Sequence, residues 1–186
     1  MGSALKVLDG PGFDEIVKAA QAGESAALKQ LVLATQTRLF KFCLALTHNP
    51  EQAQDVMQDV YIKVFAAIKN LSDPNAYWPW LFRIAKNSFL DSKRNAAEES
   101  SNTDDTFLNQ LMDPLSATER EDLLAVQQTL SHFKTEDRLL ILLVDLEEYA
   151  YHEAAEILGI SENAVRSRLH RLRARFLEIF KARETK

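Results

Sequence analysis

The chain has 186 residues, 46% of them hydrophobic, so one or two modest domains with packed cores are expected and wholesale disorder is excluded. Five glycines, five prolines and long runs at helical spacing argue against a sheet-rich fold, and the single cysteine, Cys43, excludes an intramolecular disulfide. No signal-like segment opens the chain, and its longest apolar run, 139–144, is too short to span a bilayer. We therefore expect an all-α cytoplasmic protein without stable membrane insertion.

The net charge of −5 is distributed unevenly along the chain. Residues 96–122 hold eight acidic side chains and one basic one, whereas residues 161–186 hold eight basic and three acidic ones. Because polyanions respond to the local field more than to the net charge, the acidic balance does not exclude DNA binding through the carboxy-terminal segment.

The first part of the chain predicts a helical bundle. Apolar side chains recur at helical spacing in four stretches, 13–22, 25–46, 50–71 and 77–94. Gly23 is placed to end the first helix, and Asn49 is placed to cap the third, with Pro50 at its first position. We expect residues 13–95 to form one four-helix domain, with Cys43 as a core thiol rather than a redox sensor.

The fourth of these helices combines aromatic and basic side chains. Opening a DNA duplex requires unstacked bases to be held, and aromatic faces together with cations can hold them. The alternative is that the aromatic residues are core. We favour the core for Trp80, Phe82 and Phe89, and both interpretations stay open for Trp78.

Residues 96–118 are rich in Asn, Ser, Thr, Asp and Glu and predict a flexible acidic linker. Fully extended at ~3.3 Å per residue, such a linker spans roughly 75 Å, more than two turns of a DNA duplex. Two modules joined by it can therefore bind one DNA molecule at separate places.

A second helical domain is predicted over residues 119–183. Helices are expected up to Phe133, from a Thr135 cap to Leu146, from Tyr151 to Leu158, and from Glu162 to about Ala182. The last two are arranged as a helix-turn-helix, with small Ala155 at the helix contact, Gly159 and Ile160 at the corner, and Ser161 as the cap.

The last helix has a distinct polar face. Val165, Leu169, Leu172 and Phe176 recur at spacings that define a buried side, so Arg166 and His170 should point outward. A guanidinium fork suits guanine edges in the major groove and phosphates beside it. The alternative is that these charges form a solvated helix face. The position of the face directly behind the helix-turn-helix corner favours contact with DNA.

These motifs resemble the extracytoplasmic-function (ECF) sigma factors. Residues 122–176 are similar to their region four, with Glu153-Ala154-Ala155 and Val165-Arg166-Ser167-Arg168 at its characteristic positions. Residues 13–95 are similar to their region two, through the segments 55–61 and 80–87. The chain departs from the family pattern at Phe133-Lys134, Tyr149-Ala150 and Asn163-Ala164, the last at the DNA-facing end of the helix.

The resemblance implies three sets of binding residues. For a coiled coil of the largest polymerase subunit they are Asp55, Gln58, Asp59, Tyr61 and Lys63. For the downstream promoter element and its melting they are Asp73, Asn75, Trp78, Arg83, Lys86, Asn87, Lys93 and Arg94. For the upstream element they are Ser161, Asn163, Arg166, Ser167, Arg168, His170, Arg171 and Arg173.

The expected function is therefore that of a sigma factor that binds core RNA polymerase and promoter DNA, is held inactive by an anti-sigma factor, and is a monomer when free. No catalytic residue, cofactor or metal site is expected, because no metal-ligand spacing or phosphate-binding loop is present. Two alternatives are a stand-alone helix-turn-helix regulator, which would bind duplex DNA without polymerase, and an enzyme that carries a helical nucleic-acid module.

Overall fold

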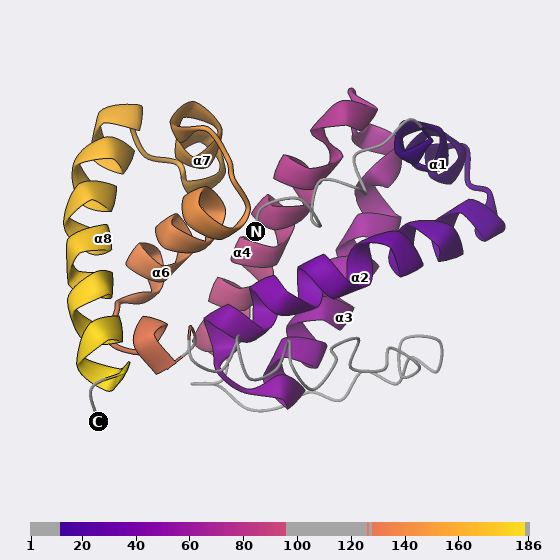
Figure 1. The fold of residues 1–186 in the computed structure, drawn as a ribbon. Coiled ribbons are helices and arrows are strands. Elements are labelled where there is room, and N and C mark those ends of the chain that lie inside the picture. Colours follow the sequence, from indigo (N-terminus) through magenta and orange to yellow (C-terminus); the bar gives the residue numbers. More distant parts are fainter. Residues whose placement is uncertain (1–11, 96–125, 127, 185–186) are drawn as a thin grey trace. The chain divides into compact units, whose positions relative to one another are not determined.

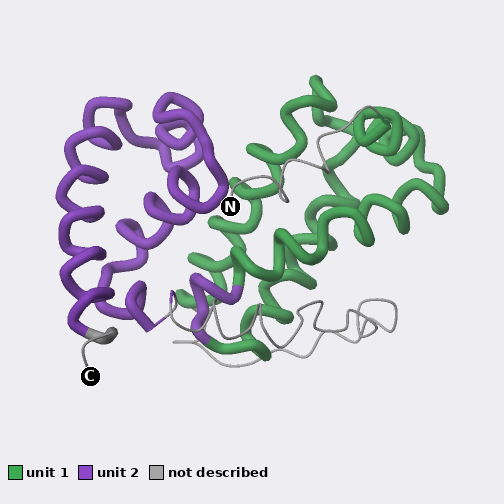
Figure 2. Tube along the Cα trace, in the orientation of Figure 1, with its two compact units in different colours: residues 1–43, 49–114 green, residues 44–48, 115–186 purple. Residues whose placement is uncertain are grey.

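The computed structural model describes residues 12–95, 126 and 128–184, and every regular element in these ranges is helical (Figure 1). The all-α prediction is confirmed. The chain divides into two compact units, residues 1–43 with 49–114 and residues 44–48 with 115–186 (Figure 2).

The predicted linker, 96–118, lies outside the described residues. The ends of the two predicted domains, 13–95 and 119–183, therefore stay predictions. Among the described helices none is long and apolar enough to cross a membrane.

Residues 13–95 form the four expected α-helices, with two short 3-10 helices between the third and the fourth. In chain order they are α1 (Phe13–Gln21), α2 (Ser25–Thr47), α3 (Pro50–Ala67), η2 (Ile68–Asn70), η3 (Pro74–Ala76) and α4 (Tyr77–Asn95).

Local signals set the helix ends. Gly23 follows α1 with a φ of 87°, a left-handed conformation that costs glycine little, and its N–H donates to the Ala20 carbonyl at 3.0 Å. At the start of α3, the Asn49 side chain accepts the backbone N–H of Gln52 at 3.0 Å, and Pro50 is the first helical residue. Both signals were predicted from the sequence and are confirmed.

The core of the amino-terminal unit contains a cluster of aromatic rings. Phe42 and Phe82 pack with their ring centroids 4.6 Å apart, and α1 contributes Phe13, which stacks on Trp78 at 5.7 Å. Cys43 is fully buried, and burial raises the pKa of its thiol to about 12, so the thiol stays neutral. The prediction of a core thiol is confirmed.

The carboxy-terminal unit contains α6 (Thr135–Ile141), the π-helix η5 (Leu142–Leu146), α7 (Tyr151–Leu158) and α8 (Glu162–Glu184). Thr135 was predicted to cap α6, but Lys134 occupies the cap position and Thr135 is the first helical residue. The predicted helix continues to Leu146, and its second half, from Leu142, is a π-helix that the sequence did not indicate. Asp145 lies in this π-helix and forms an ion pair with Arg173 of α8.

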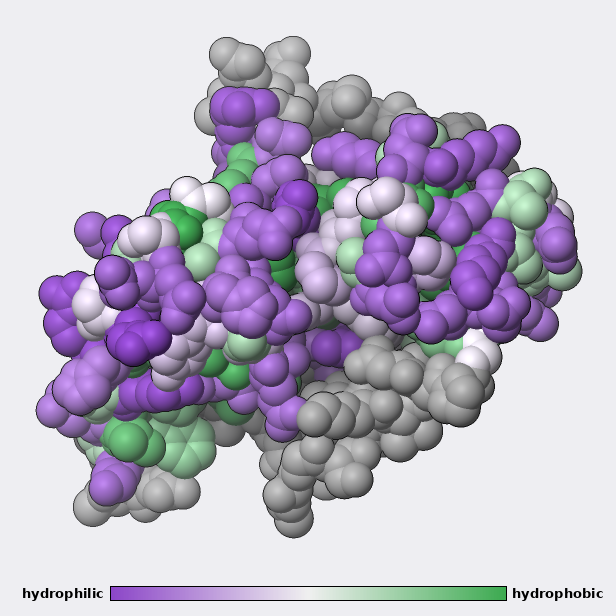
Figure 3. Space-filling model, turned by 90° about the horizontal axis from the view of Figure 1, so that it is seen from above, coloured by the Kyte–Doolittle hydropathy of each residue, from purple (hydrophilic) through white to green (hydrophobic). Residues whose placement is uncertain are grey.

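Hydrophobic side chains are exposed mainly as single residues. The face in Figure 3 is mostly hydrophilic, with hydrophobic residues in small separate patches. The large hydrophobic side chains that are exposed in the described ranges are Leu33, Ile62, Leu90 and Leu177. Isolated exposed residues of this kind are normal for a folded protein.

Candidate functional site

The corner between α7 and α8 has the geometry of a helix-turn-helix. Gly159 ends α7 with a φ of 71°, and its N–H donates to the Ala155 carbonyl at 2.8 Å. The Ser161 hydroxyl accepts the Ala164 N–H at 3.2 Å and so caps α8. Ala155 is buried between the helices, and Ile160 is half-buried at the corner. The predicted motif is confirmed as a structure.

The polar face of α8 points to solvent. Val165, Leu169 and Leu172 are buried, as the spacing predicted. The side chains predicted for the upstream element are all exposed: Ser161, Asn163, Arg166, Ser167, Arg168, His170, Arg171 and Arg173. Arg166 pairs with Glu162 one turn earlier at 3.0 Å, an exposed contact that a competing ligand can displace at little cost.

Arg173 differs from Arg166 because its ion-pair partner, Asp145, lies on another element. Its Nε and Nη2 donate to Asp145 Oδ1 at 2.9 and 2.5 Å, and Nη1 donates to the Tyr151 hydroxyl at 3.4 Å. The hydrogen bond to Asp145 raises the pKa of Arg173. These contacts join α8 to η5 and α7. The DNA contact of Arg173 stays a prediction, and these contacts, which sequence spacing did not reveal, make a structural role its alternative.

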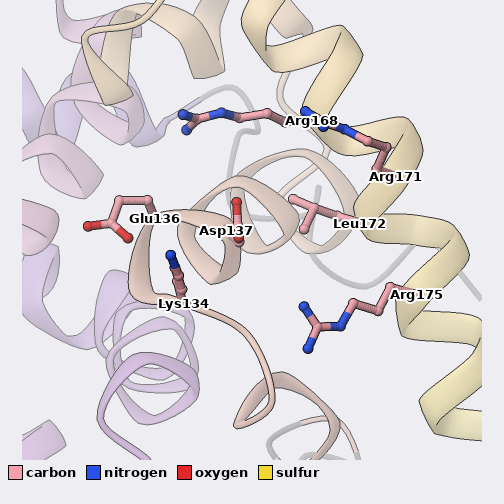
Figure 4. Close-up of a pocket in the computed structure, with 7 residues that line it drawn as sticks. All are labelled: Lys134, Glu136, Asp137, Arg168, Arg171, Leu172 and Arg175. Atoms are coloured by element: carbon pink, nitrogen blue, oxygen red, sulfur yellow. The ribbon is translucent and has the colours of Figure 1, made fainter.

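A basic notch of about 500 Å³ lies between α8 and the start of α6, along one edge of the polar face. It is lined by Lys134, Glu136, Asp137, Arg168, Arg171, Leu172 and Arg175. Figure 4 shows Arg168 and Arg175 extending from α8 toward α6 at the two ends of the notch, with Leu172 between them. The sequence prediction missed Lys134 and Arg175. Arg175 could have been found from the sequence, because Arg168, Arg171 and Arg175 recur at helical spacing.

The outer face of α3 carries the predicted polymerase-binding residues. Asp55, Asp59 and Lys63 are exposed and Gln58 is half-buried. Lys63 donates to Ser88 Oγ at 2.9 Å, and its Nζ lies 3.6 Å from Asp91 Oδ2 on α4. Partial burial is the main cause that raises the pKa of Asp59; Lys63 opposes it, and the charges of Asp55 and Asp91 add to it. This face is therefore weakly acidic, and Lys63 connects it to α4.

Tyr61 does not belong to that face. Its side chain is fully buried, its hydroxyl lies 2.9 Å from Thr35 Oγ on α2, and burial raises the pKa of the phenol. A buried ring cannot contact a partner while the bundle stays folded, so the prediction for Tyr61 is wrong. It occupies the inward side of α3 together with Val60 and Val64.

The loop before α4 is held in place by side-chain hydrogen bonds. Asp73 Oδ1 accepts both the backbone N–H and the side-chain amide of Asn75 at 2.9 Å, while both residues remain exposed. Gln21 of α1 donates its amide to the carbonyl of Leu71 at 2.5 Å. The loop thus presents Asp73 and Asn75 in a defined turn.

The two tryptophans of α4 exchange their expected places. Trp78 is buried: it stacks on Phe13, and the Arg38 guanidinium lies 4.1 Å from the centroid of its ring. Its assignment to melted DNA is corrected to a core role. Trp80, predicted to be core, is only half-buried. The reason is that Trp78 lies one turn before Phe82 on the inward side of α4, whereas Trp80, two residues after Trp78, is turned by about 200° around the helix, away from that side.

The remaining α4 residues predicted for the downstream element differ in exposure. Arg83 and Lys86 are half-buried, and burial followed by the charge of Arg83 lowers the pKa of Lys86. Asn87, Lys93 and Arg94 are exposed. Arg94 pairs with Asp91 at 3.0 Å, so its charge is partly compensated. Among the described residues, no group of three or more His, Cys, Asp or Glu side chains could hold a metal ion.

Two ranges of the chain match known families. Residues 31–99 match the family described as Sigma-70 region 2, and residues 123–176 match Sigma-70, region 4. Together these ranges cover well over half of the chain and contain most of the amino-terminal helices and the whole α7–α8 corner.

Several curated proteins are similar over most of their length. The RNA polymerase sigma-H factor of Pseudomonas aeruginosa is 29% identical over 86% of this chain and 89% of its own. The ECF RNA polymerase sigma factor SigM of Mycobacterium tuberculosis is 28% identical over 89% of this chain and 83% of its own.

A solved structure has a similar arrangement of helices. The sigma factor RpoE, in complex with the anti-sigma factor NepR from Bartonella quintana, superimposes with a TM-score of 0.64 at 25% identity. The match covers 82% of this chain and 96% of that one.

Proposed function

The chain belongs to the sigma-70 family of RNA polymerase sigma factors, within its ECF group, and we propose how its two units divide the work of transcription initiation. Sigma factors are initiation factors rather than enzymes, so phosphodiester synthesis belongs to the polymerase. In this proposal the amino-terminal unit binds core polymerase and the melted downstream strand, and the carboxy-terminal unit binds the upstream element as duplex.

The observation that carries the upstream assignment is the exposed basic face of α8 behind a capped helix-turn-helix corner. Arg166 and His170 lie one turn apart on this face and are both exposed, so each can reach a base edge in the major groove. Ser161, Asn163 and Ser167 flank them near the start of α8, where free backbone N–H groups favour a phosphate. Arg168 and Arg171 lie toward the notch edge of the exposed face and bind the backbone.

The polymerase-docking proposal rests on the exposed face of α3. Because Tyr61 is buried, the residues that we propose to dock on polymerase are Asp55, Gln58, Asp59 and Lys63. Two carboxylates one turn apart form an acidic strip that suits a basic partner surface. We assign this partner to the coiled coil of the largest polymerase subunit.

The downstream proposal rests on the loop at 72–76 and the outer side of α4. Asp73 and Asn75 are exposed in a fixed turn, which suits recognition of a single flipped base. Arg83, Lys86, Asn87, Lys93 and Arg94 supply polar and basic contacts along α4. Trp80 takes the stacking role that Trp78 cannot perform, because part of its ring reaches the surface.

Regulation by an anti-sigma factor is the natural extension of this proposal. The structurally similar RpoE is described in complex with such a factor. We further propose that the free protein is a cytoplasmic monomer, because few large hydrophobic side chains are exposed on the described residues.

Reconstituted transcription tests the function directly. Core polymerase with the wild-type chain should initiate from a subset of a random promoter library, and the chain alone should bind the same duplexes weakly. Arg166→Ala should cost ~1–3 kcal/mol in promoter binding and relax the preference at one upstream base pair. Glu162→Ala, which removes only the ion-pair partner of Arg166, is the matched control and should keep the base preference.

Two outcomes would count against this proposal. If the wild-type chain stimulates no initiation from any template in the library, the function itself is wrong. If Arg166→Ala weakens all promoters equally, Arg166 is a phosphate contact and the reading face lies elsewhere on α8.

A further inference from the structure

The basic notch has more positive than negative charge. Four basic side chains line it against two carboxylates, those of Glu136 and Asp137 on α6. Lys134 and Arg168 have no ion-pair or hydrogen-bond partner for their side chains within the described ranges. The notch is therefore a concave surface whose positive charge is concentrated along α8 and at the start of α6, with the carboxylates on the α6 side.

Arg175 is held in place before any ligand binds. Its Nη2 donates to the His132 carbonyl at 3.2 Å, and its guanidinium carbon lies 5.1 Å from the centroid of the Phe133 ring. These two contacts fix the position of the guanidinium and leave further N–H donors for another acceptor. A positioned guanidinium loses less conformational entropy on binding a phosphate than a freely rotating one.

The arginines of the notch form a row along one side of α8. Arg168, Arg171 and Arg175 recur at helical spacing, and at ~1.5 Å per residue the row is about 10 Å long. One strand of duplex DNA carries one phosphate per nucleotide, so a row of three guanidinium groups can contact successive phosphates of that strand. Ser167 and His170, both exposed, separate this row from Arg173, which is engaged with Asp145 on the other side.

We propose that Lys134 and Arg175, together with Arg168 and Arg171, bind the sugar–phosphate backbone of the DNA strand that borders α8. This inference rests on the proposed upstream-element function and adds two residues from outside the recognition motif. The notch fixes the orientation of α8 on the duplex and contributes affinity that is independent of sequence. Base discrimination stays with Arg166 and His170.

The salt dependence of promoter binding tests the proposal. A promoter is first selected from a random-sequence library with wild-type holoenzyme, and its affinity is then measured over a series of KCl concentrations. In the holoenzyme with Lys134→Gln and Arg175→Gln, the slope of log affinity against log salt should fall in magnitude by about 1.8, since each lost contact contributes about 0.9. The preferred promoter sequence should not change.

Three further variants make the result specific. Lys181→Gln removes a cation from α8 outside the notch and should leave the slope unchanged. Arg175→Lys keeps the charge and should stay close to wild type. Lys134→Gln alone changes an exposed side chain that has no partner among the described residues. It therefore controls for a folding defect caused by the change at Arg175, and it should lower the slope by about 0.9.

Each other outcome overturns the inference. A wild-type slope in the double variant shows that the notch does not contact DNA. A changed preference at one base pair makes Lys134 or Arg175 a base reader, and a loss of core polymerase in co-purification makes the notch a protein-binding surface. If wild-type holoenzyme selects no promoter at all, the proposed function fails, and the notch inference fails with it.

Discussion

The ion pair between Arg173 and Asp145 allows a structural role of Arg173 to be tested against its predicted contact with DNA. Two guanidinium nitrogens donate to one carboxylate oxygen at 2.9 and 2.5 Å, and the two side chains are 45% and 32% exposed. An exposed ion pair contributes about 0.2–1 kcal/mol, and a charge-assisted hydrogen bond about 1.5–3 kcal/mol. At intermediate exposure and with two donors, we expect a coupling energy of about 1 kcal/mol.

A double-mutant cycle with Arg173→Gln, Asp145→Asn and the combined variant measures this coupling in urea unfolding. Both tryptophans of the chain, Trp78 and Trp80, lie in the amino-terminal unit, so their fluorescence reports that unit alone. Circular dichroism reports the helices of both units. The coupling should appear in the circular-dichroism transition of the carboxy-terminal unit and leave the fluorescence transition unchanged.

The same variants distinguish the structural role from DNA contact. Arg173→Gln should leave the salt slope of promoter binding at its wild-type value once the fraction of folded protein is taken into account. A coupling below about 0.3 kcal/mol, combined with a slope reduced by about 0.9, would refute the structural role. Arg173 would then be the phosphate contact that the sequence pattern first indicated.

Two other predictions concern the amino-terminal unit. Asp59→Asn should stabilise this unit at pH 7 by only a few tenths of a kcal/mol, because the raised pKa means that ionised Asp59 costs stability and solvent screens most of that cost at an exposed side chain. This gain should vanish as the pH falls below the ordinary pKa of a carboxyl group, where wild-type Asp59 is protonated in both states. The same variant should weaken core polymerase binding in co-purification, while an unchanged affinity would move the docking surface away from Asp59. Tyr61→Phe removes a buried hydrogen bond to Thr35 and should lower the free energy of unfolding by about 1 kcal/mol. The affinity for polymerase should not change. A loss of affinity with unchanged stability would return Tyr61 to the docking surface.

Much of the local structure was predictable because it depends on neighbours in sequence. The caps at Asn49 and Ser161 and the left-handed ends at Gly23 and Gly159 each involve residues a few positions apart. Hydrophobic periodicity likewise indicated the buried face of α8, and the α7–α8 corner followed from the same signals.

Other assignments required the neighbouring elements. Periodicity places Trp78 and Trp80 in one helix, but the packing of Phe13 and Arg38 against Trp78 decides which ring is buried. Tyr61 lies in a helix with an acidic outer face, and only the position of Thr35 on α2 shows that its hydroxyl points into the core.

The basic residues of α8 show the same division most clearly. The sequence by itself determined that α8 has a basic outer face, since the helical period separates buried from exposed positions. Only the tertiary structure decided which partner each cation has. Asp145, from η5, pairs with Arg173, whereas His132 and Phe133 hold Arg175 at the notch. The physical reason is that a long charged side chain reaches partners from other elements, and their distances along the chain carry no periodic signal.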